Sequence, residues 1–364
     1  MIKKIDWYIL KKFLTTFFFC LILLTLVVVV VDISEKTDDF AKTKLPVIKI
    51  INDYYLAFIP KMDAMLAPLF VFISVIFFTS KMANRSEVIA ILSSGVSFAR
   101  FLRPYFLGGL LLSGLLWFGN KYTLPRANEK WAAFDAKYIK FNYQDYKNSS
   151  SLANYYFRLD SFSYAGIRYY DTTSRSGNNF FIQTFHNNQL VYNLRAESIT
   201  WDTSTSKWRL DRLIERRFNV LGEEIREKPT MQVAYNFRPR DLQRDEYMKD
   251  KLSSPDLNEF IRLEKIRGSE DVNSLLIERY TRDAIPASIL ILTMIGAILS
   301  SRKVRGGSGF HLAMGVVITV LYILVGRFAT VFAVKGNFDP WIAAWLPNFV
   351  FGLLTVYLYQ KSPK

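Results

Sequence analysis

Nineteen consecutive residues without a charge, 13–31, constrain the fold of this chain more than any other stretch. A membrane-spanning helix needs roughly 20 predominantly apolar residues, because each residue adds about 1.5 Å along the helix axis. A cleaved signal peptide is the alternative. The run is long for one, however, and residues 32–35, Asp-Ile-Ser-Glu, are no small-residue cleavage site. The sequence therefore predicts a membrane protein that keeps its first span.

Five more apolar segments can cross a bilayer, and a long polar stretch separates the first three spans from the last three. The six predicted spans cover residues 13–31, 54–80, 98–119, 284–300, 310–334 and 341–359. We therefore expect an α-helical membrane protein with six transmembrane helices (3+3) and an inserted domain. The predicted parts are a first transmembrane half, a β domain, a helical connector and a second transmembrane half, at 1–120, 121–250, 251–283 and 284–364.

The formal net charge of +15 raises the question of nucleic acid, so the position of the charges matters. Residues 121–283 hold 27 Lys and Arg against 23 Asp and Glu, a net of +4, which leaves +11 for the hydrophobic remainder. In the short loops and span ends, 13 basic residues fall on the side of the N-terminus and six on the other side. The positive-inside rule then predicts cytoplasmic termini and an extracytoplasmic inserted domain, with no nucleic-acid partner.

The inserted segment consists mainly of short aromatic or β-branched runs separated by turn-forming residues. The predicted strands cover 155–160, 164–170, 180–186, 190–201, 208–218 and 231–237. A hairpin turn is predicted between Trp201 and Trp208. We expect a small antiparallel sandwich or open roll, followed by helical segments at 256–267 and 271–283.

Motifs for catalysis are absent from the sequence. It contains no Gly-x-x-x-x-Gly-Lys-Ser/Thr phosphate loop, no Gly-x-Ser-x-Gly elbow and no His-Glu-x-x-His zinc motif. The single cysteine, Cys20, and the two histidines offer no metal-ligand spacing. We therefore expect no catalytic residues, no cofactor and no metal, and any ATP hydrolysis must come from a partner protein.

The stretch 83–104 begins after the second predicted span, runs into the third and carries a helical pattern of its own, with most of its polar residues at its two ends. Glu87 suits the positive end of a helix dipole, and Gly95 suits a left-handed cap after the last turn. The pattern predicts a short helix at about 84–95 between two membrane spans, and the alternative is a surface helix that only turns the chain around. The residues that carry the pattern are Arg85, Glu87, Val88, Ile91, Leu92 and Gly95.

Four basic residues near or within the spans are candidates for binding an anionic substrate: Lys36, Lys42, Lys44 and Arg327. The three lysines follow the first span, where mixed charge is also an ordinary feature of a loop. Arg327 lies inside the fifth span, where an ionised side chain costs at least about 2.5–3.5 kcal/mol near the bilayer centre. It either faces protein or a polar cavity, or extends to the outer headgroups.

Several short motifs, taken in order, resemble the lipopolysaccharide export permeases of the LptF/LptG type. They are Arg85-Ser86-Glu87 with Ser94-Gly95-Val96-Ser97 and Pro104, Pro125 with Asn128, Glu278 with Arg282 and Pro286, and Gly336 to Pro340 with Trp345-Leu346-Pro347-Asn348. The resemblance covers the whole chain. It rests on the order and spacing of the motifs, since no single one is specific.

The resemblance implies a permease subunit of an ABC-type complex in the bacterial inner membrane, with a jellyroll-like periplasmic domain. Such a subunit pairs with a sister permease (LptF/LptG-like) on a cytoplasmic ATPase dimer (LptB-like). It extracts lipopolysaccharide from the outer leaflet and passes it to periplasmic bridge proteins (LptC/LptA-like). The resemblance implies that the helix at about 84–95 is the cytoplasmic coupling helix, with Arg85, Glu87, Val88, Ile91, Leu92 and Gly95 as the ATPase-coupling residues. In the family, basic residues after the first span contact the lipid's phosphates; Asp32 and Lys36 fit that stretch here, whereas Val29 and Glu35 depart from it.

Other classes of function stay open. A mechanotransmitting membrane subunit of a different ABC-type complex also combines spans with an extracytoplasmic domain and moves no lipid, but such proteins commonly have four spans. A membrane-anchored enzyme would need the catalytic motifs that the sequence lacks. The choice between an F-like and a G-like subunit is also open.

Overall fold

The computed structural model describes residues 3–139, 151–187, 189–219, 222–242, 248–267, 269, 271–304 and 307–362. The chain divides into two compact units. The membrane unit comprises Met1–Asp135, Lys249–Leu257 and Asn273–Lys364, and the β unit comprises Ala136–Met248 and Asn258–Val272. The membrane unit is therefore assembled from both ends of the chain and a short internal segment.

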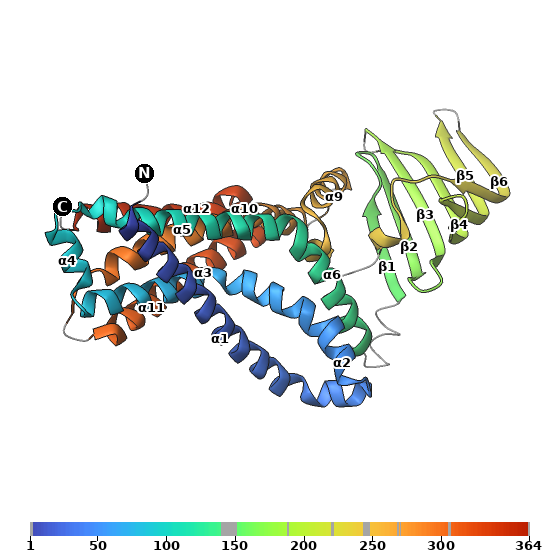
Figure 1. Cartoon of the computed structure of the whole chain (residues 1–364). Helices are drawn as coiled ribbons and strands as arrows, with labels where there is room; N and C mark the ends of the chain where they lie inside the picture. Colours follow the sequence, from blue (N-terminus) through green and yellow to red (C-terminus); the bar gives the residue numbers. More distant parts are fainter. Residues whose placement is uncertain are drawn as a thin grey trace. The chain divides into compact units, whose positions relative to one another are not determined.

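Helices form the membrane unit (Figure 1). The long ones are α1 (Lys4–Thr43), α3 (Leu56–Asn84), α5 (Phe98–Phe118), α10 (Val272–Ser300), α11 (Gly307–Lys335) and α12 (Pro340–Gln360). The short ones are α2 (Val47–Ile50), α4 (Glu87–Ser93), α6 (Leu124–Phe134), α8 (Met248–Lys251) and the first turn of α9 (Ser254–Arg267). Two π-type turns, η1 (Ile51–Tyr55) and η2 (Gly119–Thr123), join α2 to α3 and α5 to α6.

The six predicted spans are confirmed. Six helical segments in the described part of the chain are long and apolar enough to cross a membrane: Lys4–Thr43, Val47–Asn84, Phe98–Ile139, Val272–Ser300, Ser308–Lys335 and Pro340–Gln360. The helix predicted at 271–283 and the fourth predicted span form one continuous helix, α10, with Pro286 inside it.

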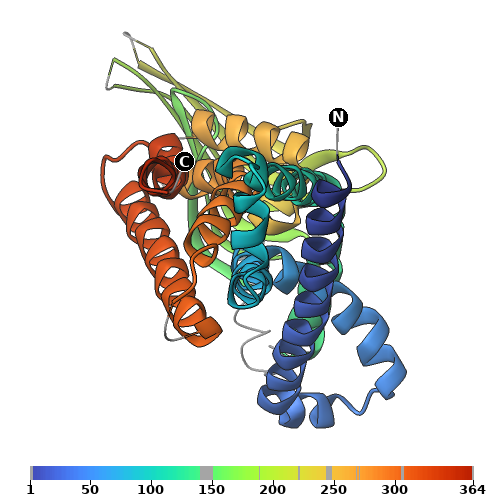
Figure 2. The same cartoon turned by 60° about the vertical axis from the view of Figure 1, so that its left-hand side comes forward.

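One end of the membrane unit carries α4 and both ends of the chain, and the opposite end carries α2 (Figure 1). Two contacts tie the first of these ends together: Arg100 Nη2 lies 3.8 Å from Asp6 Oδ2, and Arg302 Nη2 donates to the Lys361 carbonyl at 2.6 Å. Within the bundle α3 packs against both α1 and α11, which lie on opposite sides in Figure 2. Helix α3 therefore lies between α1 and α11 and holds both through its apolar surface.

Helix α1 packs closely against α5 at a glycine. A Cβ atom at Gly108 would lie 2.5 Å from the ring of Phe13, so only glycine admits this approach. Phe13 is completely buried there. Beyond this contact α1 exposes many large apolar side chains, for example Phe19 (63 % exposed) and Ile22 (68 % exposed). This exposure suits a helix that faces lipid or another apolar partner.

The β unit holds one antiparallel sheet of six strands: β1 (Ser151–Arg158), β2 (Ser163–Asp171), β3 (Ser176–His186), β4 (Gln189–Asp202), β5 (Lys207–Asn219) and β6 (Gly222–Val233). Strands adjacent in the chain are adjacent in the sheet, so the topology is a meander. Trp201 pairs with Trp208, as the predicted hairpin requires. The Trp208 indole is buried in the core of one face and donates to the Phe237 carbonyl at 2.8 Å. The described strands form one sheet, so the expected inserted β domain is confirmed, whereas two packed sheets, as in a sandwich, are not present among them.

The predicted position of the sixth strand is wrong. Strand β6 spans Gly222–Val233, whereas the prediction placed it at 231–237. Most of β6 is exposed, and it pairs only with β5, at the edge of the sheet. Residues 223–228 are all charged except Ile225. The strand therefore lacks the alternation of apolar and polar residues by which a half-buried strand is recognised in a sequence.

The alternation of buried and exposed side chains slips by one residue midway along the sheet. On β2 the buried apolar residues are Ala165 and Ile167 and then Tyr170. Two residues near the slip, Asn179 on β3 and Arg212 on β5, have positive φ angles of 54° and 49°. A left-handed residue interrupts the pleat, so the following side chains exchange faces and one face stays apolar.

Candidate functional site

A buried carboxylate, Asp32, organises a polar cluster toward the end of the bundle that carries α2. Tyr54 Oη donates to Asp32 Oδ1 and Tyr55 Oη donates to Asp32 Oδ2, each at 3.1 Å. Lys36 Nζ lies 3.3 Å from Asp32 Oδ1, one helical turn along α1, and donates to the Tyr54 hydroxyl. We call Asp32, Lys36, Tyr54 and Tyr55 the Asp32 cluster. It ties α1 to η1 through both carboxylate oxygens.

Aromatic rings surround the ammonium of Lys36. Nζ lies 4.7 Å from the ring centre of Tyr54, 5.8 Å from that of Phe58 and 5.9 Å from that of Trp131. Lys61 Nζ approaches the same Trp131 ring at 3.3 Å. Because the face of an aromatic ring is negative, these rings stabilise two ammonium groups in a largely apolar setting. Within the cluster the charge of Lys36 is balanced by Asp32, and Lys61 adds a second ammonium on the Trp131 ring beside it.

The other predicted substrate-binding residues lie apart from this built site. Lys42 is exposed and pairs with Asp39 at 3.4 Å. Lys44 is exposed and ends α1 with a left-handed φ of 53°. Arg327 is exposed on α11 and has no hydrogen bond or ion pair to any residue that the structure describes. Of the four candidates, only Lys36 belongs to the Asp32 cluster.

The predicted loop helix is present as α4, Glu87–Ser93, and its two end signals are confirmed. Glu87 occupies its first turn, and Gly95 has a φ of +85°, the left-handed conformation that the sequence predicts. The Tyr8 hydroxyl of α1 donates to Glu87 Oε2 at 3.4 Å, a long hydrogen bond. Asn84 Nδ2 donates to Ser308 Oγ at 3.2 Å, which connects the start of the loop to α11.

The apolar side of α4 faces its own bundle. Val88 is only 1 % exposed, and Ile91 and Leu92 pack against the same core. These three predicted coupling residues therefore anchor the helix, and Val88 in particular is closed to a partner. The outward side carries Ile89, which is 51 % exposed, and Arg85, which is also exposed.

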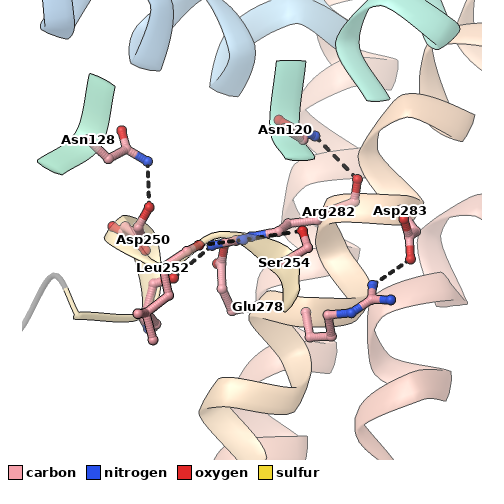
Figure 3. A network of polar contacts seen from close by, with 10 residues as sticks. Asn120, Asn128, Asp250, Leu252, Ser254, Glu278, Arg282 and Asp283 are labelled. Atoms are coloured by element: carbon pink, nitrogen blue, oxygen red, sulfur yellow. Dashed lines mark hydrogen bonds and ion pairs between the residues drawn. The ribbon is translucent and has the colours of Figure 1, made fainter. Parts of the chain in front are cut away.

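A buried arginine on α10, Arg282, holds α8 and the start of α9 (Figure 3). Its Nη2 donates to the Lys249 carbonyl at 2.7 Å, and its Nη1 donates to the Leu252 carbonyl at 2.8 Å. Its Nε donates to Glu278 Oε1 at 3.1 Å, and Ser254 Oγ lies 3.4 Å from Nη1. The Arg282 side chain therefore donates to two backbone carbonyls, one in α8 and one between α8 and α9.

Two asparagines connect the first transmembrane half to this region, one to α10 itself and one to α8. Asn120 Nδ2 donates to the Arg282 carbonyl at 3.3 Å, and Asn128 Nδ2 donates to the Asp250 carbonyl at 3.0 Å (Figure 3). A cavity of about 210 Å³ adjoins these contacts and is also lined by Lys61 and Glu278. Together with Arg282, these contacts form the Arg282 network, in which residues more than 100 positions apart meet.

Known proteins can now be compared with this architecture. A family model described as "Lipopolysaccharide export system permease LptF/LptG" matches residues 7–361. The chain belongs to the LptF/LptG family. No curated protein matches the chain in sequence. Members of the family are membrane permease subunits and are not themselves ATPases.

The structure gives several LptF/LptG motif residues a physical role. Asn128, Glu278 and Arg282 belong to the Arg282 network. Asn348 on α12 donates through Nδ2 to the Ala284 carbonyl at 2.7 Å and accepts from the Tyr322 hydroxyl at 2.9 Å. These residues join helices to one another. Sequence reasoning placed them in motifs but found no partners, because the partners lie far away along the chain.

Sequence reasoning missed the two tyrosines of the Asp32 cluster. A signal was available: adjacent tyrosines follow an acidic residue, Asp53, at the beginning of a span, where aromatic residues usually sit at the interface. That signal indicates an interfacial position. It does not indicate that both hydroxyls turn inward to Asp32, since this depends on the packing of α1 against η1.

Proposed function

We propose that this LptF/LptG permease extracts lipopolysaccharide from the outer leaflet of the bacterial inner membrane and passes it to periplasmic bridge proteins. It would act as one subunit of an ABC-type complex, beside a sister permease and on a cytoplasmic ATPase dimer. The observation that carries the proposal is the architecture within this family: six potential spans in one unit and a separate sheet inserted between the third and fourth.

In this proposal the end of the membrane unit that carries α4 lies in the cytoplasm. The excess of basic residues in the loops at that end supports this orientation. A permease that does not hydrolyse ATP itself must receive the work for transport through a contact with the ATPase. For this contact α4 offers the half-buried Glu87 beside the exposed Arg85 and Ile89. We assign the contact with the ATPase to this outward side of α4.

The opposite end, with the Asp32 cluster, would then face the outer leaflet, and the β unit would lie in the periplasm. Phosphate groups of lipopolysaccharide are anionic and form charge-assisted hydrogen bonds with ammonium groups. Lys42, even in its exposed pair with Asp39, and Lys44 are accessible to such groups, whereas Lys36 is half-buried and paired with the buried Asp32. We therefore assign headgroup attraction mainly to Lys42 and Lys44, with Arg327 as a further candidate and Lys36 as the residue that shapes the site.

The test is reconstitution of the chain with its sister permease and ATPase in vesicles that contain lipopolysaccharide. Photo-crosslinking to a soluble bridge protein then reports transfer of the lipid. ATP-dependent transfer that is lost when the permease chain is omitted is the expected result. ATP hydrolysis without any transfer of lipid would contradict the proposal and would instead indicate a mechanotransmitting subunit.

A further inference from the structure

The face of the sheet opposite its core carries an aromatic pair over a glycine. The strand register places Tyr156, Gly166, Phe181 and Arg195 in one row across β1 to β4. A Cβ atom at Gly166 would lie 2.5 Å from the ring of Phe181 and 2.8 Å from that of Tyr156. The two rings therefore lie over the glycine and form a floor, with centres 6.0 Å apart and planes at 51°.

A cavity of about 500 Å³ opens over this aromatic floor. Its polar lining comes from Arg168, Asn179, Gln183 and Arg195. Surface pockets of 300–1,000 Å³ are typical of small-molecule sites, so the cavity has the volume for a ligand of moderate size. The slip of the pleat contributes to its shape, because Asn179 at the slip has a left-handed backbone and also lines the cavity.

The two arginines of the cavity are available for an anion. Neither Arg168 nor Arg195 has a hydrogen bond or an ion pair to any of the residues that the structure describes, and both are exposed. Glu197, two residues from Arg195 along β4, is engaged by Arg212 at 2.7 Å. The cavity lining carries two positive charges and no carboxylate. Arginine binds phosphate groups through a planar set of donors, which gives both strength and orientation.

We propose that this cavity, formed by Tyr156, Arg168, Phe181, Gln183 and Arg195, binds a phosphorylated saccharide. The arginines hold the phosphate, the Gln183 amide bonds hydroxyl groups, and the C–H face of a puckered sugar packs on the aromatic floor by dispersion. The 51° angle between the rings favours a puckered sugar over a flat base, because a base can stack fully on only one of them. The site needs neither α4 nor the Asp32 cluster, and so it stands independently of the lipid-export proposal.

The test uses the full-length protein in detergent micelles, with glucose 1-phosphate as the probe and saturation-transfer NMR as the readout. We expect binding at millimolar concentration or tighter, and at least about tenfold weaker binding of glucose and of inorganic phosphate. The double variant Arg168→Gln/Arg195→Gln should weaken binding of glucose 1-phosphate at least about tenfold. Phe181→Leu should reduce the preference for glucose 1-phosphate over inorganic phosphate.

The matched control is Arg209→Gln/Arg226→Gln, which removes two exposed arginine charges elsewhere on the same sheet. It should bind glucose 1-phosphate as the unchanged protein does. Absence of binding to the unchanged protein overturns the proposal, and so does equal loss in both double variants. Tighter binding of adenosine monophosphate than of glucose 1-phosphate also overturns it. Equal melting temperatures of the variants show that a loss of binding is not a loss of folding.

A phosphorylated saccharide can come from a glycolipid headgroup or from a free sugar phosphate. A lipid-linked saccharide phosphate in the same micelles separates the two sources. Displacement of glucose 1-phosphate by the lipid-linked form supports the site as one for a headgroup. Displacement only by water-soluble sugar phosphates supports it as one for a free metabolite.

Discussion

The half-buried carboxylate of Glu278 and the buried guanidinium of Arg282 form an ion pair one helical turn apart on α10, with Oε1 3.1 Å from Nε. The same guanidinium also satisfies the carbonyls of Lys249 and Leu252. The pair therefore connects a transmembrane helix to the turn that precedes it. Replacing Glu278 leaves Arg282 charged and buried, and replacing Arg282 removes the donors to both carbonyls.

Arg282→Met should strongly destabilise the membrane unit. The variant removes the donors to the Lys249 and Leu252 carbonyls, and a buried polar group left without a partner costs about 1–3 kcal/mol. Glu278, whose side chain is 28 % exposed, also loses its counter-charge. Thermal unfolding of the purified protein in detergent measures the effect as a fall in melting temperature. The control is Arg262→Met on α9, where the pair with Glu259 is exposed and should be worth at most about 1 kcal/mol. Equal melting temperatures for the two variants would contradict the role of Arg282.

Glu87→Lys should release the ATPase or uncouple ATP hydrolysis from lipid extraction, while the helices and the sheet stay folded. The reason is that a reversed charge on the outward side of α4 repels the basic group that we expect on the partner. Co-purification of the ATPase and release of lipopolysaccharide are the measurements. Tyr8→Phe is the control, since it removes the 3.4 Å hydrogen bond to Glu87 and leaves the charge in place. Normal retention and normal release with Glu87→Lys would rule out the contact.

Asp32→Asn should lower the melting temperature of the protein more than Asp39→Asn does. Asp32 is 8 % exposed and accepts from two tyrosines as well as pairing with Lys36, so its loss leaves an ammonium without its counter-charge. Asp39 forms only the exposed pair with Lys42, and its replacement should change the stability by less than about 1 kcal/mol. Melting temperatures of the two variants decide the comparison, and a smaller effect at Asp32 would refute it.

Gly108→Val should separate α1 from α5. The added side chain would meet the Phe13 ring, which already lies 2.5 Å from the position of a Cβ atom. Overpacking of this kind costs about 1–3 kcal/mol. Gly114→Val is the matched control on the same helix, because no atom lies within 4 Å of its Cβ position. Equal melting temperatures of the two variants would contradict the need for glycine at position 108.

The turn between β4 and β5 should make the β unit less stable at low pH. Hydrogen bonds from Ser204 and Thr205 lower the pKa of Asp202 to about 2. A depressed pKa means that Asp202 contributes stability above its unfolded pKa, about 4, and loses that contribution as the pH falls toward 2. Asp202→Ala should therefore lower stability at pH 6 and make little difference near pH 2. Unfolding followed by tryptophan fluorescence at both pH values checks this, and a difference that is constant with pH would contradict it.

Local patterns predicted the elements that depend on local physics. The six spans follow from runs of apolar residues, and the left-handed Gly95 follows from its place after the last turn of α4. Strand β6 was misplaced for the same reason, since an exposed edge strand does not need apolar alternation. The periodicity of apolar residues indicates which side of a strand is buried. It therefore does not locate a strand such as β6, which is mostly exposed and is held in the sheet by its pairing with β5.

The contacts of the candidate site could not be predicted from the sequence. Tyr54 and Asp32 lie on separate elements, and Asn128 meets Asp250 across 122 positions. Such pairs depend on how helices approach one another, which the spacing of residues within each helix does not record. The inward direction of Val88 is a similar case, because an apolar stripe fits its own bundle as well as it fits a partner's groove.

Taken as a pivot, the contact of Phe13 with Gly108 divides α1 into one long arm and one short arm. About 29 Å of helix separate Phe13 from Asp32, at about 1.5 Å for each residue. A rotation of α1 by about 10° about this pivot therefore sweeps Asp32 through about 5 Å, the length of one helical turn. The arm on the other side of the pivot, which carries Tyr8, is much shorter. For a rigid α1 that turns about this contact, a displacement of Tyr8, which bonds to Glu87 of α4, corresponds to a larger displacement of Asp32.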